Sequence, residues 1–461
     1  MTEECARCAG GRCRCGAGVV TVHAVGSANF RRFWFGQTLS QFGTRIGTLG
    51  LSVTAVELLH ADSGQVGILA AASTVCYLLI GLPAGAWVDR MLKRRTMMVA
   101  ALVRSLTVLA VPVLWLVGGL RIEVLYAVAL VVGVVSVFFD VAYQSYVPVL
   151  VPDDDVPTAN ARLEASAQVS TLGGPALAGL LMRIISAPVV LLVDALAYLV
   201  SFLCLAATRD GEQRTAPVPR TRGRLAADIA EGLRFVRDQP VIRRLALAMG
   251  VSNFFATMVA TLVPILVMRT LGFDSFMLGL VMTCGAVGGV LGALLAPRAR
   301  RRFSVGAVMS CGLLTAAFFT VSSPLAAWVA PHSRFLAGAV LLVGEFGLTV
   351  GALLFNVTQV SLRQSLCPKH LLGRMNASIR FVVWGSMPPA SLLAGWLGSA
   401  LGVVPTLWIG VVGSVATVLP ILTVDRLVPA PATPSQAAAS GRRSSPPARP
   451  AGPGVPFSDP G

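Results

Sequence analysis

Charged residues are scarce in this chain: they make up 13% of its 461 residues, against about 25% in a typical soluble protein. Histidine is rarer still, with four dispersed copies at positions 23, 60, 332 and 370. The phosphate-binding pattern G-x-x-x-x-G-K-[S/T] does not occur, which argues against ATP as an energy source. These scarcities exclude an ordinary soluble protein. We therefore predict that the chain is not an enzyme and needs no cofactor.

Apolar residues are correspondingly abundant, at 55% of the chain, and the mean hydropathy is +0.75. An apolar run of roughly 20 residues is long enough to cross a bilayer as a helix. The sequence contains twelve such runs, at about 35–58, 65–88, 97–118, 122–142, 164–183, 188–207, 245–268, 276–296, 305–328, 335–359, 376–400 and 404–424. We therefore predict an all-α membrane protein with twelve transmembrane helices.

The formal net charge of +16 is distributed unevenly between the loops. With both termini inside, the inner segments hold most of the bases, including Arg31, Arg32, the cluster at 90–95 and the cluster at 298–302, whereas the outer loops hold Arg121, Arg183, Arg269 and Arg334. Because arginine and lysine collect on cytoplasmic loops, this asymmetry predicts a plasma-membrane protein with both termini in the cytoplasm. The bases then face anionic lipid headgroups rather than nucleic acid.

Composition divides the chain into five parts. Residues 1–34 form a cytoplasmic leader without a clean apolar core, and residues 35–207 contain the first six spans. Residues 208–244 are a polar cytoplasmic linker that ends in an amphipathic helical pattern, and residues 245–424 contain the other six spans. Residues 425–461 are rich in proline, alanine and serine and cannot bury a core, so we expect a disordered cytoplasmic tail.

The two groups of six spans share a repeat. Pro152, Asn160, Ala161, Ala178 and Gly179 match Pro368, Asn376, Ala377, Ala394 and Gly395 at an offset of 216. Asp62, Ser63 and Gly67 match Asp274, Ser275 and Gly279 at an offset of 212, and Gly85 with residues 93–95 matches Gly292 with residues 300–302 at 207. Parallel repeats of this kind are typical of transporters in which two bundles rock about one central cavity. We therefore predict two six-helix bundles.

Three segments resemble one known family. "GAWVDRMLKRR" resembles the signature loop between spans two and three of the major facilitator superfamily, with Gly85, Asp89, Arg90, Lys93 and Arg94 on the matching positions and Leu92 in place of the usual second glycine. "FFDVAYQSYVPVLVP" and "NARLEASAQVSTLGGPALAG" resemble the enterobactin-exporter-like and macrolide-efflux-like branch of that superfamily. The resemblance covers about residues 28–425 and implies the major facilitator fold.

The signature loop combines one acid with four bases between two apolar runs. The resemblance implies a gate, in which Asp89 caps the N-terminus of span eleven near Asn376 and accepts from an arginine when the outer side is open. The alternative is that the bases only fix the topology, but an acid adds nothing to such a signal. Asp140, at the inner end of span four, is expected to form an ion pair with this loop.

A second motif lies in span five: Ser170, Gly174, Pro175, Ala178 and Gly179. It resembles the motif that marks exporters in the superfamily. Glycine lets helix backbones approach, and proline removes one helix hydrogen bond, so the motif is expected to let span five bend and pack closely.

Charges inside the spans cost about 2.5–3.5 kcal/mol each on insertion and therefore invite a functional explanation. Arg45 in span one and Glu345 in span ten are candidates for contact with substrate or protons, since these spans usually line the cavity in the family they resemble. Asp194 in span six is a third candidate, with a structural hydrogen-bonded acid as the alternative. Arg104 and Arg380 also lie in spans, and span four lacks the arginine that the superfamily's exporters usually carry there.

The N-terminal cysteines Cys5, Cys8, Cys13 and Cys15 could bind a metal ion, but the pairs are separated by only four residues, which is short for a zinc module, so we predict no metal site. The sequence favours a monomeric secondary exporter of amphipathic small molecules such as a drug, siderophore or secondary metabolite, with protons and membrane lipids as its other partners. An uptake symporter and a non-pumping sensor or lipid-handling protein of the same fold remain the alternatives.

Overall fold

The computed structural model describes residues 28–88, 91–209, 231, 234–368 and 372–421, and the regular structure in these ranges is helical. The first half contains α1 (Ala28–Val53), α2 (Ser63–Val88), α3 (Lys93–Leu116), α4 (Ile122–Leu150), α5 (Val156–Leu181) and α6 (Ala187–Ala207). The second half contains α8 (Pro240–Ile265), α9 (Ser275–Arg300), α10 (Val305–Thr320), α11 (Ser322–Val329), α12 (Arg334–Leu366), α13 (Leu372–Gly385), α14 (Met387–Ala400) and α15 (Val403–Ala416).

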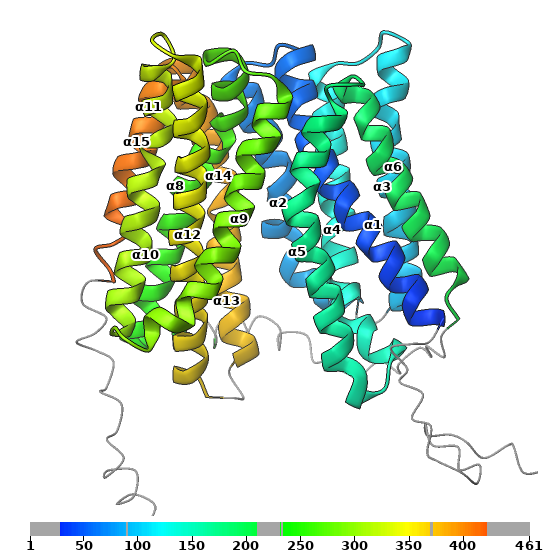
Figure 1. Cartoon of the computed structure of the whole chain (residues 1–461). Coiled ribbons are helices and arrows are strands. Elements are labelled where there is room, and N and C mark those ends of the chain that lie inside the picture. The colour runs from blue at the N-terminus through cyan, green and yellow to red at the C-terminus, as the bar shows by residue number, and fades with distance from the viewer. Residues whose placement is uncertain (1–27, 89–90, 210–230, 232–233, 369–371, 422–461) are drawn as a thin grey trace, which may run out of the picture.

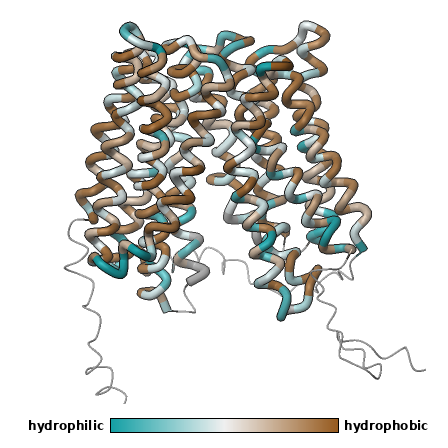
Figure 2. The backbone as a smooth tube through the Cα atoms, in the orientation of Figure 1, coloured by the Kyte–Doolittle hydropathy of each residue, from teal (hydrophilic) through white to brown (hydrophobic). Residues whose placement is uncertain are grey.

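Within the described ranges, eight helical stretches are long and apolar enough to cross a membrane, among them Ile122–Leu150 and Arg334–Leu366. Large apolar side chains also cover the outside of the molecule: Leu79, Phe318, Trp328 and Phe335 are each at least 69% exposed. Figure 2 shows the apolar residues along the length of the helices and the hydrophilic ones gathered toward the helix ends. A surface of this kind requires a lipid environment, so the chain is a multi-pass membrane protein.

The helices of each half pack mainly against one another, as α1 does on α6, α2 on α4, α9 on α12 and α8 on α15. Contacts between the halves are made chiefly by α2 with α14 and by α5 with α9. In Figure 1 the two groups of helices lie together at the upper end and diverge at the lower end, where α1 begins. α1 starts at Ala28, inside the range expected for the leader, because Phe30 and Phe33 are buried against the first half.

The repeat extends to the backbone. A π-helical turn follows α1 at Thr54–Leu58, and a second one follows α8 at Leu266–Thr270, which is again an offset of 212 residues. The chain then turns through a positive φ at His60 in the first half and at Gly272 in the second. The two halves therefore enter α2 and α9 by the same sharp turn.

The halves differ where the proline-bearing helices are compared. α5 runs as one helix through Pro175, whereas the corresponding segment of the second half is interrupted at Ser386, between α13 and α14. Asn253 of α8 binds this interruption, donating from Nδ2 to the Val383 carbonyl at 2.7 Å and to the Ser386 hydroxyl at 3.1 Å. Pro388 and Pro389 at the start of α14 lack N–H donors and interrupt the helix, and Asn253 satisfies the Val383 carbonyl beside the break.

Candidate functional site

Two adjoining cavities lie between the halves. The first cavity has a volume of about 380 Å³ and is lined by α1 of the first half and by α8, α9, α10, α12 and α15 of the second. The second cavity has a volume of about 500 Å³ and is lined by α1, α2, α3, α4 and α6 together with α8 and α14. Thr48, Ser52, Ala260 and Pro264 line both. Both volumes are in the range of small-molecule binding sites.

Glu345 of α12 lines the first cavity. Gly285 of α9 makes room for it, because a Cβ atom at Gly285 would lie 2.9 Å from the Glu345 Cγ. One turn along α12, the Thr349 hydroxyl donates to the Gly285 carbonyl at 2.6 Å and fixes the two helices against each other. The structure thus places this predicted contact residue at a cavity wall.

Asp194 of α6 lines the second cavity from a deeper position, with only 4% of its surface exposed. It lies against α1, where a Cβ atom at Gly43 would be 2.9 Å from the Asp194 Oδ1. Tyr198, one turn further along α6, shares a 2.9 Å hydrogen bond with Thr44 of α1. The glycines of α1 therefore allow α6 to bring a carboxyl group to the cavity.

Arg104 of α3 is a buried cation in the first half, with 6% of its surface exposed. Its guanidinium lies 4.7 Å from the ring centroid of Phe139 and 5.3 Å from that of Tyr198. Its positive charge also acts on the carboxyl groups of Asp194 and Asp140. The sequence marks Arg104 as a charge within a span but gives it no role, because its aromatic partners come from α4 and α6 and no spacing connects them. In the folded protein, Arg104 therefore contributes a positive charge that acts on two acids.

Asp140 lies beside a smaller cavity of about 150 Å³ between α2, α4 and α13. It accepts a hydrogen bond from the Tyr77 hydroxyl at 2.9 Å. Trp384 of α13 packs edge-on against Tyr77 with ring centroids 4.4 Å apart, and the Arg380 guanidinium lies 4.9 Å from the Trp384 ring. The surroundings of Asp140 therefore include residues of both halves. Its expected ion pair with the signature loop stays a prediction.

The signature loop itself is described only at its edges. Asp89 and Arg90 lie outside the described residues, Gly85 is within α2, and Lys93 and Arg94 open α3. Arg94 donates a hydrogen bond to the Thr208 carbonyl at the end of α6. This hydrogen bond attaches the basic end of the loop to α6 of the first half. The spacing of residues in the loop did not predict this contact.

The motif of span five faces two neighbours. Gly174 lies against α1, where its Cβ would be 2.5 Å from the Cβ of Arg45, and Gly179 lies against Phe276 of α9. Ser170 and Ala178 are fully buried, and the Pro175 carbonyl would lie 2.5 Å from a Cβ at Gly279. Arg45 is exposed and does not line either of the two large cavities. The motif thus brings α5 close to helices of both halves.

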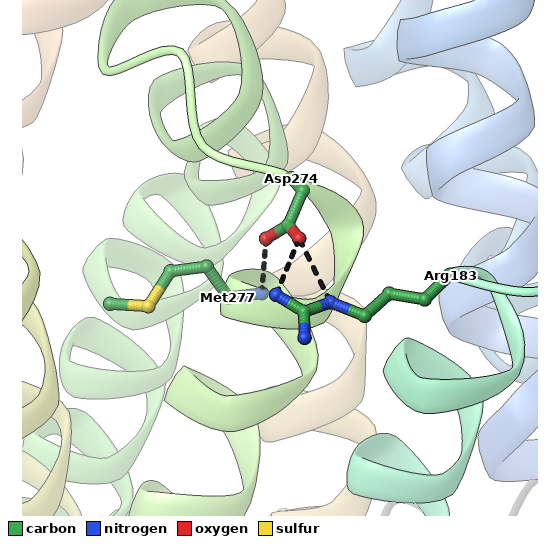
Figure 3. A network of polar contacts seen from close by, with 3 residues as sticks. All are labelled: Arg183, Asp274 and Met277. Atoms are coloured by element: carbon green, nitrogen blue, oxygen red, sulfur yellow. Dashed lines mark hydrogen bonds and ion pairs between the residues drawn. The ribbon is translucent and has the colours of Figure 1, made fainter.

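An ion pair crosses between the halves near the end of α5. The Nε and Nη2 atoms of Arg183 each lie 3.2 Å from the Asp274 Oδ2, as Figure 3 shows, while the Asp274 Oδ1 accepts from the Met277 backbone at the start of α9. The Arg183 guanidinium also lies 4.2 Å from the Phe276 ring centroid. In the sequence, Arg183 counts only as a base of an outer loop, so this contact was missed.

No group of three or more potential metal ligands occurs within the ranges that the structure describes. The N-terminal cysteines lie outside those ranges.

Comparison with known proteins matches most of the chain. Residues 33–388 match the profile of the Major Facilitator Superfamily. The chain is 30% identical over 385 residues to the multidrug efflux pump Tap of Mycolicibacterium fortuitum, covering 79% of this chain and 90% of that protein. It is 26% identical over 380 residues to YfiS, an uncharacterised transporter of this type from Bacillus subtilis, covering 81% and 86%.

Solved structures of low sequence identity share the fold. A bacterial homologue of the iron transporter ferroportin, in an inward-facing state, aligns with a TM-score of 0.70 at 14% identity, covering 86% of this chain and 98% of that one. A bacterial homologue of the human lysosomal transporter Spinster, inward-facing and unoccupied, aligns with a TM-score of 0.67 at 15% identity, covering 88% and 100%.

Proposed function

Because the chain belongs to the Major Facilitator Superfamily, we propose that it is a secondary active exporter of amphipathic small molecules. The observation that carries the proposal is the pair of adjoining cavities between the halves, whose walls are mostly apolar and bear few ionisable side chains. Such walls suit a loosely specific ligand that is partly apolar. The resemblance to a multidrug efflux pump at 30% identity supports the outward direction.

The proposed architecture is twelve transmembrane helices in two six-helix bundles, with α10 and α11 forming one span and α13 and α14 another. The protein works as a monomer in the plasma membrane with both termini in the cytoplasm. The two bundles rock about the cavities, so that the site faces each side of the membrane in turn. The shared turn before α2 and α9 supports equal roles for the two halves in this motion.

Proton antiport is the proposed energy source. A carboxyl group in apolar surroundings favours its protonated form and can take up or release a proton as the surroundings change. Asp194 and Glu345 each line one cavity, so a proton there can be coupled to the passage of substrate. Gly85, Asp89, Arg90, Lys93, Arg94 and Asp140 form the proposed inner gate.

Accumulation of a panel of dyes and antibiotics in cells with and without the protein tests the proposal. We expect lower accumulation of at least one compound in expressing cells, and we expect a protonophore to abolish the difference. Higher accumulation in expressing cells would support the uptake symporter instead. Equal accumulation for every compound would leave a sensor or lipid-handling protein as the better explanation.

A further inference from the structure

The two cavity acids differ in their counter-charges. The positive charge of Arg104 acts on Asp194, although the two side chains form no direct ion pair. No cation acts on the Glu345 carboxyl group, and no hydrogen bond or ion pair to that group occurs, among the residues that the structure describes. Glu345 is also the single acid or base that lines the first cavity within those residues. The first cavity therefore contains a carboxyl group whose ionised form the described protein does not balance.

Most hydroxyl groups that line the first cavity are already engaged, with Ser252 as the exception. Hydroxyl groups that line the first cavity donate to carbonyls of their own helices: Thr48 to Thr44 at 2.8 Å, Ser52 to Thr48 at 3.1 Å, Thr320 to Ala316 at 2.8 Å and Ser414 to Gly410 at 2.8 Å. The rest of the wall is largely aliphatic, with residues such as Val259, Val281, Met282, Leu313 and Leu348. An ionised carboxylate in such a wall is costly unless a positive charge accompanies it.

The position of Glu345 is fixed rather than accidental. Gly285 and Gly288 of α9 let α12 approach so closely that a Cβ atom at Gly285 would lie 3.1 Å from the Glu345 Oε1. Thr349 bonds the Gly285 carbonyl from the same face of α12. The close packing of α9 and α12 therefore holds the Glu345 carboxyl group at the cavity wall and restricts its side-chain conformations.

We infer that the first cavity binds amphiphiles that carry one positive charge, with Glu345 as the counter-charge and the aliphatic wall as the contact for their apolar groups. This inference rests on the proposed export function and specifies the substrate class of that site. The volume of about 380 Å³ fits a compact drug-sized cation. Asp194 has the positive charge of Arg104 in its surroundings, so we assign the charge selection to Glu345.

Tetraphenylphosphonium and tetraphenylborate test the inference, because they have nearly the same shape and opposite charges. Binding of each is measured to the purified full chain in detergent. We expect the cation to bind at least about tenfold more tightly than the anion, because the Glu345 carboxylate attracts the cation and repels the anion. Glu345→Gln keeps the shape and removes the charge, so the coulombic attraction is lost and binding of the cation should weaken by about tenfold or more. Glu123→Gln, an exposed acid at the start of α4, is the matched control and should bind like the parent.

Equal binding of the two probes by the parent would overturn the inference without use of any variant, so misfolding of Glu345→Gln cannot hide a failure. Unchanged binding of the cation by a folded Glu345→Gln variant would overturn it as well. Transport measurements in cells distinguish failure of this inference from failure of the proposed export function. If cells export neutral amphiphiles and the parent does not discriminate the probes, export stands and the charge selection is wrong. If cells export no compound of either charge, the proposed function itself is wrong, and the charge selection falls with it.

Discussion

The halves meet at two helix crossings that the internal repeat relates to each other. We call each crossing a seam. In the first seam, Gly179 of α5 faces Gly279 of α9. In the second seam, Gly395 of α14 faces Gly67 of α2. Gly179 corresponds to Gly395 at the offset of 216, and Gly279 corresponds to Gly67 at 212. Each seam therefore pairs one glycine from each half, and the four glycines make the same contact twice.

The polar contacts beside the seams are not the same. The first seam has the Arg183–Asp274 ion pair, whose side chains are 55% and 50% exposed. The second has a neutral hydrogen bond, in which the Gly64 backbone donates to the Ser399 hydroxyl at 2.9 Å. The comparison indicates that close glycine packing holds the halves together here, because it is common to both seams. The ion pair is an addition to one of them, and half-exposed pairs are weak.

Leucine in place of Gly67 or Gly279 should have the largest effect. A Cβ atom at Gly67 would lie 2.6 Å from the Ser391 carbonyl, and one at Gly279 would lie 2.5 Å from the Pro175 carbonyl. Backbone atoms cannot move aside, so each variant should disfavour the closed seam by about 3 kcal/mol or more and abolish transport. Distances between spin labels at Gly119→Cys and His332→Cys, in the loops after α3 and α11, report the opening.

The matched control for these variants is Gly81→Ala on α2, where a Cβ atom meets nothing within 4 Å. It should transport like the parent. A large effect at one seam with none at the other would show that the two seams are not equivalent.

Gly174→Leu should have the next largest effect. The atom that opposes it is the Cβ of Arg45, on a side chain that can shift in part with α1, so a cost of about 1–3 kcal/mol is expected. Its counterpart on α14 is Ala390, which is fully buried and already has a Cβ atom. Transport should fall by about tenfold while the amount of folded protein in the membrane is unchanged. Normal transport would remove the best local support for the motif of span five as a working part.

The sequence indicated the repeat, and the four glycines of the two seams are among its matching residues, because matches at a fixed offset are visible without a structure. It also predicted Glu345 as a candidate contact residue, since a charge within an apolar span is costly. It did not predict that Gly67 meets Gly395 or that the charge of Arg104 acts on both Asp140 and Asp194. Those contacts join helices far apart in the chain, and their geometry depends on how the helices cross. The break at Ser386 does have a signal in the sequence, because Pro388 and Pro389 follow it and lack helix N–H donors, but its contact with Asn253 has none.

Asp89→Asn tests the opposite end of the molecule and should act in the opposite direction. If Asp89 caps the start of span eleven in the outward-open state, the loss of its charge removes about 1–3 kcal/mol from that state. A shift of about 1.4 kcal/mol changes a two-state ratio tenfold, so the population should move toward the inward-open form. Net export should slow with little loss of folded protein, and the label distance across the seams should shorten on average. Export and distances equal to those of the parent would leave the loop as a topology signal alone.

Asp274→Asn should have the smallest effect, and Asp62→Asn is its matched control. Both acids accept a backbone hydrogen bond at a helix start, from Met277 at 3.0 Å and from Gln65 at 2.8 Å, and asparagine keeps a cap oxygen at both positions. Only Asp274 also pairs with Arg183. Asp274→Asn should therefore favour opening of the first seam by about 0–1 kcal/mol, and this effect should fade at high salt because exposed charges are screened. Asp62→Asn should show no such salt dependence in the label distances. Equal, salt-independent shifts in the label distance for the two variants would mean that the ion pair does not contribute. The two seams would then be equally stable despite their different polar contacts.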